Sequence, residues 1–216
     1  MNWWRRLAAR HGRRPALTPE LRARIRANFE EAADDEEHFP SRIDPRILHV
    51  RVVLEHLGDL GGGRVMDVGC GKGRFARIVA ERHPRARVYG VDISGAMLAF
   101  LPKCVAGCQA LMTELPFADA SVDAAYATES LEHAVEIEKA VGEICRVVKP
   151  GGPIAIIDKN IEQWGRLGTP EWERWFGREE LEGLLARHCR QVSSRAISYW
   201  DDVAPDGLFL AWLARK

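Results

Sequence analysis

A glycine-rich turn between a short apolar run and an amphipathic stretch constrains the fold of this chain more than any other feature. The apolar run 64–68 leads directly into Gly-Cys-Gly-Lys-Gly at 69–73, and a helical pattern of apolar residues begins at 75–79. Glycine is needed where the backbone turns tightly or where a ligand approaches it without a Cβ in the way. The segment is therefore predicted to be a strand, a turn open to a ligand, and a helix.

The next predicted strand adds a carboxylate to this turn. Strand 87–91 is followed by Asp92, where an acid can accept two hydrogen bonds from a ribose diol. The glycines follow GxGxG rather than GxGxxG, and Asp67 lies two residues before the first of them. A pyrophosphate is disfavoured by a nearby carboxylate, whereas an amino group and a sulfonium cation are favoured by it. The pattern therefore predicts a nucleoside site for S-adenosylmethionine rather than for a dinucleotide.

The rest of the chain alternates short apolar runs with helical stretches, which is typical of a parallel sheet built from βαβ units. Further strands are predicted at 108–112, 122–127, 154–157, 192–199 and 208–213, and helices at 137–148 and 178–188. Only the short segment 201–207 separates the last two strands. Because so short a link cannot hold a crossover helix, these two strands are predicted to pair antiparallel.

The N-terminal part is predicted to hold two helices, because Thr18-Pro19 and Asp44-Pro45 are typical helix starts. The first 26 residues carry eight arginines against one acid, Glu20, and begin with two tryptophans. A solvated leader is the favoured interpretation, and contact with an anionic membrane surface or an acidic substrate is the alternative. We expect residues 1–60 to cover the sheet or the active site and residues 61–216 to form the ligand-binding domain.

Length and composition are those of an ordinary globular protein. The 216 residues suffice for an α/β fold with a sizeable core, and 46% of them are hydrophobic. The 31 basic and 31 acidic residues cancel to a formal net charge of +0, so nucleic acid is not an expected partner. No apolar run approaches the roughly 20 residues needed to span a bilayer, and the first residues lack the apolar stretch of a secretory signal. A cytoplasmic location is therefore predicted.

The five cysteines have no CxxC spacing, so neither a disulfide framework nor a zinc site is predicted, and no metal ligands are assigned.

Five segments resemble, in order, the successive motifs of class I S-adenosylmethionine-dependent methyltransferases. They are 65–73 (VMDVGCGKG), 88–94 (VYGVDIS), 115–123 (LPFADASVD), 131–133 (LEH) and 146–152 (RVVKPGG). The resemblance covers about residues 61–160 and is nearest to the small-molecule group that includes the ubiquinone and menaquinone biosynthesis enzymes. It implies a Rossmann-like seven-stranded sheet of order 3-2-1-4-5-7-6, with strand seven antiparallel and helices on both faces. That order agrees with the C-terminal antiparallel pair predicted above.

The resemblance also implies a set of residues that bind the cofactor. Asp67 and the turn glycines would neighbour the methionine moiety, Asp92 would hold the ribose, and Ile93 would pack on the adenine. The full predicted set is Asp67, Gly69, Cys70, Gly71, Gly73, Asp92, Ile93, Met112, Thr113 and Thr128. Members of the family usually carry an aspartate four residues before the Leu-Pro-Phe motif, and this chain has Leu111 there. The backbone of Met112 or the side chain of Glu114 is the alternative contact for the adenine amino group.

The acceptor side is expected at the end of the fourth strand, because ligands of open α/β sheets bind beyond the carboxyl ends of the strands. His133 is the predicted catalytic base, and a structural role in packing or capping the next helix is the alternative. Solvated or helix-start roles are the alternatives for Glu129 and Glu132. Aromatic residues between 164 and 176 are interpreted either as an acceptor lid or as core.

The predicted activity is methyl transfer from S-adenosylmethionine to a small acceptor, in which an oxygen, nitrogen or carbon atom attacks the methyl group. Alignment of the two reactants is the main contribution expected of the protein. A methyltransferase-like protein without catalysis is the first alternative. A nicotinamide-dependent oxidoreductase, which needs GxGxxG, is the second.

Overall fold

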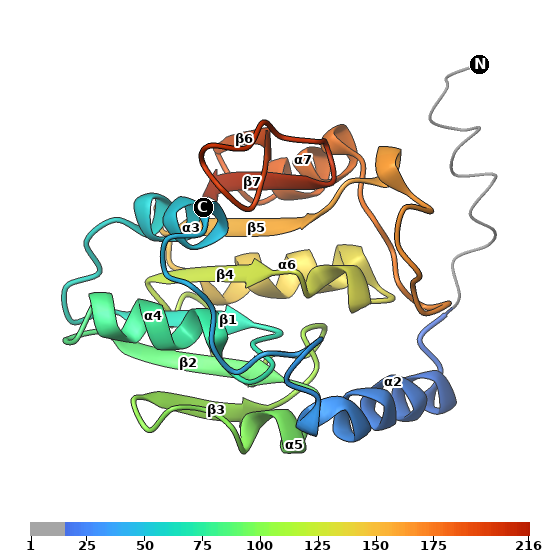
Figure 1. The fold of residues 1–216 in the computed structure, drawn as a ribbon. Helices are drawn as coiled ribbons and strands as arrows, with labels where there is room; N and C mark the ends of the chain where they lie inside the picture. Colours follow the sequence, from blue (N-terminus) through green and yellow to red (C-terminus); the bar gives the residue numbers. More distant parts are fainter. Residues whose placement is uncertain (1–15) are drawn as a thin grey trace.

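Seven strands form one mixed sheet of order β3-β2-β1-β4-β5-β7-β6 (Figure 1). A computed structural model of the chain describes residues 16–216. The strands are β1 (Arg64–Val68), β2 (Arg87–Asp92), β3 (Val105–Gln109), β4 (Ala124–Thr128), β5 (Pro153–Lys159), β6 (Gln191–Ile197) and β7 (Phe209–Arg215). β7 is antiparallel to both of its neighbours, and the neighbouring pairs from β3 to β5 are parallel. The predicted strand order and the antiparallel C-terminal pair are thus confirmed.

The third strand lies earlier in the chain than the sequence pattern predicts. Residues 108–112 were the expected strand, and the observed β3 ends at Gln109. β3 is an edge strand whose side chains are mostly exposed, so it lacks the apolar run that marks the buried strands. The apolar residues at 110–112 line the cavity described below instead.

Helices cover both faces of the sheet (Figure 1). α3 (Leu48–Leu57) and α4 (Arg74–Arg82) pack on one face, and α6 (Ile137–Val147) and α7 (Arg178–Ala186) pack on the other. The 3.6-residue spacing of apolar side chains explains this, because it gives each helix one buried stripe. The helix expected after Pro45 begins at Leu48.

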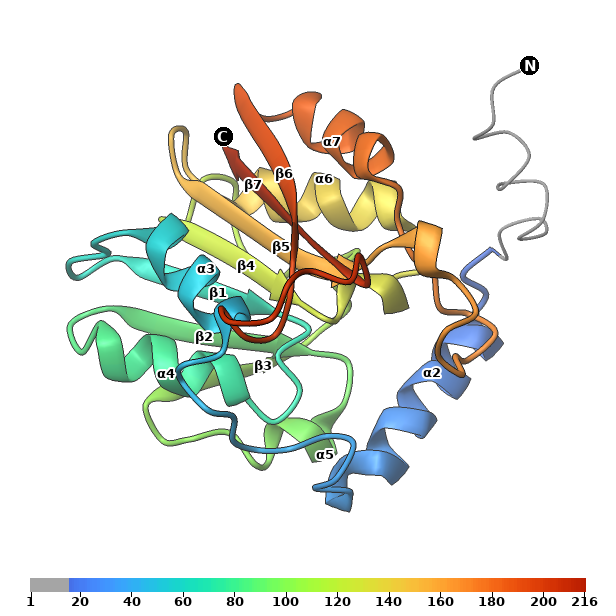
Figure 2. The ribbon, with the colours of Figure 1, turned by 45° about the horizontal axis from the view of Figure 1, so that its top comes forward.

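The helix α2 (Pro19–Glu31) begins where the sequence predicts, because the Thr18 side chain accepts a hydrogen bond of 3.2 Å from the Leu21 N–H. α2 lies beyond the carboxyl ends of the parallel strands rather than against either face (Figure 2). Glu30 holds the last turn of α2 against α5 (Gly95–Leu98). Its two carboxylate oxygens accept hydrogen bonds of 2.9 Å from the N–H groups of Gly95 and Ala96. Residues 1–15 of the predicted basic segment lie outside the described residues, and its residues 19–26 belong to α2.

Three of the aromatic residues between β5 and α7 are part of the core without being part of a helix, whereas Trp164 is exposed. Beyond the short 3₁₀ turn η3 (Ile161–Gln163), the segment 164–177 has no helix, although Trp172, Trp175 and Phe176 follow helical spacing. All three rings are buried. Trp172 also packs with Ile25 of α2, so this segment and α2 meet across the carboxyl edge of the sheet.

No helix in residues 16–216 is long and apolar enough to cross a membrane.

Candidate functional site

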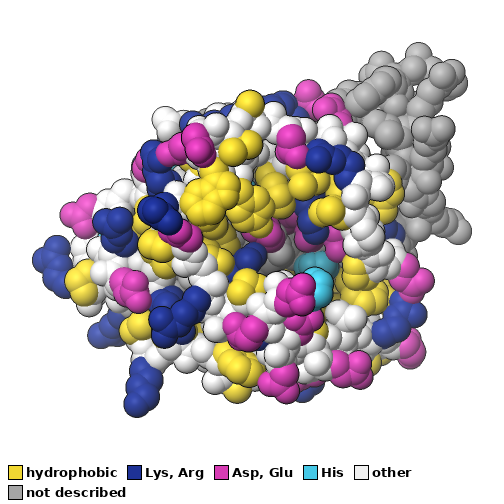
Figure 3. Space-filling model, viewed as in Figure 1, with side chains coloured by type: hydrophobic (Ala, Val, Ile, Leu, Met, Phe, Trp, Pro, Cys, Tyr) yellow, Lys and Arg dark blue, Asp and Glu magenta, His cyan; other side chains and the backbone are white. Residues whose placement is uncertain are grey.

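A cavity of about 530 Å³ lies at the carboxyl ends of β1, β2 and β4, where α2 closes over the sheet edge. Its walls come from α2, the glycine-rich turn, the ends of β2 and β4, and the segment after β5. Figure 3 shows histidine and acidic side chains beside a hollow in this face, with hydrophobic side chains next to them. A pocket at this edge is where open α/β sheets bind their ligands.

The three glycines of the turn have different roles, although all have positive φ angles. A Cβ added to Gly69 would lie 2.5 Å from the Ser130 Cβ, and one added to Gly73 would lie 2.4 Å from the Leu101 side chain. A Cβ added to Gly71 would meet nothing within 4 Å, and Gly71 lines the cavity. Gly69 and Gly73 therefore permit close packing of the protein, whereas Gly71 keeps space open for a ligand.

Asp92 connects the end of β2 to this turn. Its Oδ2 accepts a hydrogen bond of 2.8 Å from the Gly71 N–H, and its Oδ1 accepts one of 2.9 Å from the Ser94 N–H. Burial raises the pKa of the carboxyl group, and the backbone N–H donors oppose that rise. Each carboxylate oxygen accepts more than one hydrogen bond, so Asp92 retains acceptor sites for a ligand in the cavity.

Asp67 lies behind the turn rather than in the cavity wall. It is fully buried, and neither carboxylate oxygen has a hydrogen-bond partner among the described residues. Burial raises the pKa of Asp67 to about 7, although the Tyr126 hydroxyl opposes the rise.

Neither Asp67 nor Gly73 lines the cavity, so the prediction that they contact the cofactor stays a prediction. Asp67 is buried within β1, one residue before the strand ends, and Gly73 is packed against Leu101. The other predicted residues do line it: Gly69, Cys70, Gly71, Asp92, Ile93, Met112, Thr113 and Thr128.

The segment that replaces the missing aspartate of the family offers a different polar atom. Leu111, Met112 and Thr113 all line the cavity, and the Thr113 Oγ1 is buried without a hydrogen-bond partner in the described structure. Glu114 is exposed and pairs with Lys139 at 3.4 Å. Of the alternatives considered for the adenine amino group, Met112 lines the cavity and Glu114 does not, and the contact itself stays a prediction.

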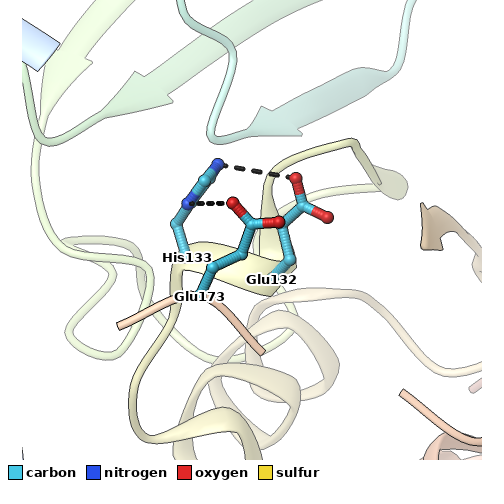
Figure 4. A group of neighbouring side chains, drawn as sticks. All are labelled: Glu132, His133 and Glu173. Carbon is cyan, nitrogen blue, oxygen red and sulfur yellow. Dashed lines mark ion pairs between the residues drawn. The ribbon is translucent and has the colours of Figure 1, made fainter. Parts of the chain in front are cut away.

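The opposite end of the cavity holds a cluster of charged side chains (Figure 4). Glu132 and His133 belong to the 3₁₀ turn η2 (Leu131–His133), Lys159 ends β5, and Glu173 comes from the segment after it. The Lys159 Nζ donates to Glu132 Oε1 at 2.6 Å and to Glu173 Oε1 at 3.1 Å. The His133 ring lies between the two glutamates, and Phe29 of α2 packs on it with 5.0 Å between ring centroids.

Burial dominates the electrostatics of this cluster. It lowers the pKa of His133, with the charges of Glu132 and Glu173 opposing the effect, so the imidazole is neutral at pH 7. Burial raises the pKa of Glu132 well above its usual range, and the neighbouring Asp158 carboxylate raises it further. Burial lowers the pKa of Lys159, but the charges of Glu132 and Glu173 and its hydrogen bonds to them raise it overall, so the ammonium between the acids stays charged.

One atom each from Glu132, His133 and Glu173 lie within 4.8 Å of one another, which is close enough to share a metal ion. The Lys159 ammonium already pairs with both glutamates, so a cation at this point would need to compete with it. The arrangement therefore suits proton transfer and hydrogen bonding better than metal ligation.

Glu129 has a structural role at the end of β4. It has a φ of 51°, and its carboxylate contacts His49 at 3.3 Å, the Tyr199 hydroxyl at 2.8 Å and Arg74 at 3.3 Å. Burial alone would raise its pKa, but these three partners hold the pKa at about 2. Glu129 is thus a fixed carboxylate that joins α3, α4 and the C-terminal loop beside the cavity.

Sequence reasoning missed Lys159, Glu173 and the α2 residue Phe29. Lys159 carried a usable signal, because it ends the fifth parallel strand at the same sheet edge as Asp92. Glu173 and Phe29 had none, because only tertiary packing brings them to His133.

Comparisons with known proteins agree with this geometry. Residues 66–156 match the family model described as a methyltransferase domain. The chain is 37% identical over 170 residues to the O-methyltransferase resE of Aspergillus sclerotiorum, covering 70% of this chain and 62% of that protein. It is 35% identical over 147 residues to the ubiquinone/menaquinone biosynthesis C-methyltransferase UbiE of Desulfotalea psychrophila, covering 60% and 59%. The chain spans between 52% and 62% of the length of the first curated relatives it matches.

A solved structure shows the same fold. Geranyl diphosphate C-methyltransferase from Streptomyces coelicolor A3(2) superposes with a TM-score of 0.68 at 18% identity, over 93% of this chain and 99% of that one. The strand order, the glycine-rich turn and the carboxylate at the end of β2 together define a class I methyltransferase domain. The region 66–156 of this chain belongs to that methyltransferase family.

Proposed function

We propose that this protein transfers the methyl group of S-adenosylmethionine to a small-molecule acceptor. The observation that carries the proposal is the cavity at Gly71, where a side-chain position is open directly beside the Asp92 carboxylate. Two named O-methyltransferases and a C-methyltransferase among the relatives support it. The catalytic domain is residues 61–216, and the N-terminal residues up to 60 contribute the cover formed by α2.

The cavity residues fit this cofactor. Asp92 has acceptor capacity for a ribose diol, and Ile93 and Met112 offer apolar surface for an adenine. The buried Thr113 Oγ1 has no hydrogen-bond partner in the described structure, and a purine could supply one. The Gly71 backbone can approach the methionine part without a Cβ in the way. When bound, S-adenosylmethionine supplies a methyl group on an electrophilic sulfonium. The protein's own contribution is to hold both reactants aligned and to exclude water.

The acceptor occupies the end of the cavity beneath α2. The apolar side chains of Ile25, Phe29, Phe39 and Leu167 line this end and suit a flat or apolar molecule. His133 is one of the polar groups in the wall of this cavity, and we assign it the role of general base. A cytoplasmic location and the absence of a nucleic-acid partner stay predictions from the sequence.

Two measurements test the proposal. Calorimetry with S-adenosylmethionine and with NADH distinguishes the cofactor, and we expect binding of the former only. Incubation with methyl-labelled S-adenosylmethionine and fractionated cell extract then tests transfer, and we expect label in a small-molecule fraction. Binding of the cofactor without transfer to any fraction would instead support a catalytically silent protein, and binding of NADH alone would support an oxidoreductase.

A further inference from the structure

A lysine inside the glycine-rich turn is almost wholly buried, and the cofactor site described above does not use it. The Lys72 side chain is only 1% exposed, and its Nζ lies 4.8 Å from the centroid of the Phe100 ring. The Nζ donates hydrogen bonds of 2.8 Å to Glu36 Oε1 and 3.2 Å to the Asp35 carbonyl oxygen. Such partners are needed, because burial of an unpaired ammonium is costly. Both come from the chain that runs from the end of α2, near α5, back to α3 (Figure 2).

Glu36 connects this lysine to a short segment without regular structure, residues 35–41. Its Oε2 accepts hydrogen bonds from the Ser41 N–H at 2.9 Å and from the Ser41 hydroxyl at 3.1 Å, while its Oε1 accepts the bond from Lys72. The hydrogen bond from Lys72 is the largest of the effects that lower the pKa of Glu36 to about 2, so the carboxylate is charged at neutral pH. One carboxylate therefore closes the 35–41 segment on itself and joins it to the glycine-rich turn.

The 35–41 segment forms part of the cavity wall at the end assigned to the acceptor. Its residues His38, Phe39 and Pro40 all line the cavity. Phe39 packs edge-on against Phe29 of α2, with 6.0 Å between the ring centroids, and Phe29 packs against the His133 ring at 5.0 Å. A continuous series of contacts thus leads from the glycine-rich turn, through this segment, to the far end of the cavity.

We propose that Lys72 is a positioning residue, which holds the 35–41 segment against the glycine-rich turn and so determines how closely the acceptor fits. The inference rests on the proposed methyl transfer and adds a residue on which acceptor binding depends. Lys72 acts through the cavity-lining residues of that segment, because its own ammonium is held by Glu36 and Asp35. The same turn carries Gly71, so the cofactor site and the acceptor wall depend on one short stretch of backbone.

The two charged partners differ in burial, so their loss should differ in effect. Glu36 is 55% exposed, whereas Lys72 is 1% exposed. Loss of the Lys72 charge leaves a carboxylate that water can solvate and that Ser41 still holds. Loss of the Glu36 charge leaves a buried ammonium without a counter-charge, which is the more costly state. Glu36→Gln should therefore loosen the segment more than Lys72→Met does, and adding Lys72→Met to Glu36→Gln should tighten it again.

Amide hydrogen exchange measures this loosening without an acceptor. The N–H groups of residues 37–39 and 41 all donate to acceptors within the 35–41 segment. We expect them to exchange about tenfold faster in Glu36→Gln, the scale for weakening a hydrogen bond to a charged group. The increase should be smaller in Lys72→Met and in the double variant.

Two exposed charges provide the controls for exchange. Glu37→Gln removes the carboxylate next to Glu36, and Lys103→Met removes an ammonium from the surface. Both variants should exchange as the parent does. Unchanged exchange in Glu36→Gln and Lys72→Met, or increases that simply add in the double variant, overturn the positioning role of Lys72.

Binding and transfer then separate the acceptor from the cofactor. By calorimetry, the affinity of Lys72→Met for S-adenosylmethionine should stay within about threefold of the parent value. In transfer of labelled methyl groups to graded dilutions of one cell-extract fraction, the amount of extract for half-maximal rate should rise about tenfold, with a much smaller change in the maximal rate. Lys103→Met should change neither quantity.

The outcomes distinguish this inference from the proposed function. Lost cofactor affinity in Lys72→Met with unchanged half-saturation would place Lys72 in the cofactor site and overturn the inference, while the proposed methyl transfer stands. An unchanged half-saturation together with an unchanged affinity overturns it as well. Absence of transfer by the parent overturns the proposed methyl transfer and with it the acceptor role of the 35–41 segment.

Discussion

The Asp92 carboxylate and the Gly71 backbone N–H are joined by a hydrogen bond of 2.8 Å, so the end of β2 and the glycine-rich turn form one unit. A ligand that bonds to Asp92 therefore lies against Gly71, the turn glycine at which an added Cβ would meet nothing within 4 Å. Under the proposed function, ribose recognition and close backbone approach occur at the same point of the cavity.

Asp92→Ala should weaken the binding of S-adenosylmethionine by about 1.5 to 3 kcal/mol, the scale for losing charge-assisted hydrogen bonds to a buried group. Calorimetry measures the affinity. Asp202→Ala, in the exposed loop between β6 and β7, is the control and should bind as the parent does. Because Asp92 also bonds to Gly71 and Ser94, the thermal unfolding of each variant is compared first. An Asp92→Ala variant that folds and binds as tightly as the parent would refute the ribose assignment.

Gly71→Val should abolish cofactor binding, because its branched side chain extends into the cavity from a position where nothing lies within 4 Å. Its φ of 51° makes any side chain there strained, so loss of stability alone must be separated from loss of the site. Gly58→Val is the matched control, since Gly58 has a φ of 64°, equally open surroundings and no place in the cavity wall. If both variants lose the same stability and both still bind, the placement of the cofactor is wrong.

Much of this cofactor end could be predicted from the sequence because its parts are local. The turn at 69–73 follows its strand directly, and Asp92 ends the next strand, so two βα units suffice to bring them together. Asp67 shows the limit of such reasoning, since its position near the turn did not reveal that it lies behind the cavity wall. A pattern gives proximity along the chain but not the depth at which a side chain is buried.

The acceptor end could not be predicted in the same way. His133 was identified from its position after β4, but the groups that control its chemistry come from separate elements. Glu173 lies in a segment without regular structure, and Phe29 lies on a helix packed beyond the sheet edge. The misplaced β3 has a related cause, because an exposed edge strand lacks the apolar run by which buried strands are recognised.

Asp67 should make the stability of the protein depend on pH. Its pKa is about 7 in the folded state and about 3.9 in an unfolded chain, so between these values only the folded state holds the proton. The stabilisation is therefore complete below the unfolded pKa and is lost as pH rises through 7. Between pH 5 and pH 8 the loss is of order 3 kcal/mol.

Asp67→Asn removes this titration. Denaturant unfolding of parent and variant at pH 5 and pH 8 measures it, and the free energy of unfolding of the variant should fall less between the two pH values. Other buried acids such as Glu132 titrate in both proteins, so the difference between the two curves isolates Asp67. Parallel curves across this range would show that Asp67 is already ionised in the folded protein.

His133→Ala should lower turnover by at least about a hundredfold, the lower bound for loss of a general base, while the affinity for S-adenosylmethionine stays within about threefold. Burial lowers the pKa of His133 from its usual 6.5, so the base is neutral at pH 7. The rate of the parent should therefore fall only where the pH drops below this lowered pKa. The alanine variant should lack this acidic limb, because no imidazole is left at this point to become protonated. His188→Ala, an exposed histidine at the end of α7, should keep both the rate and the limb. If the His133→Ala variant turns over a true acceptor at close to the parent rate, His133 has only a packing role against Phe29. Alignment of the reactants is then the source of catalysis.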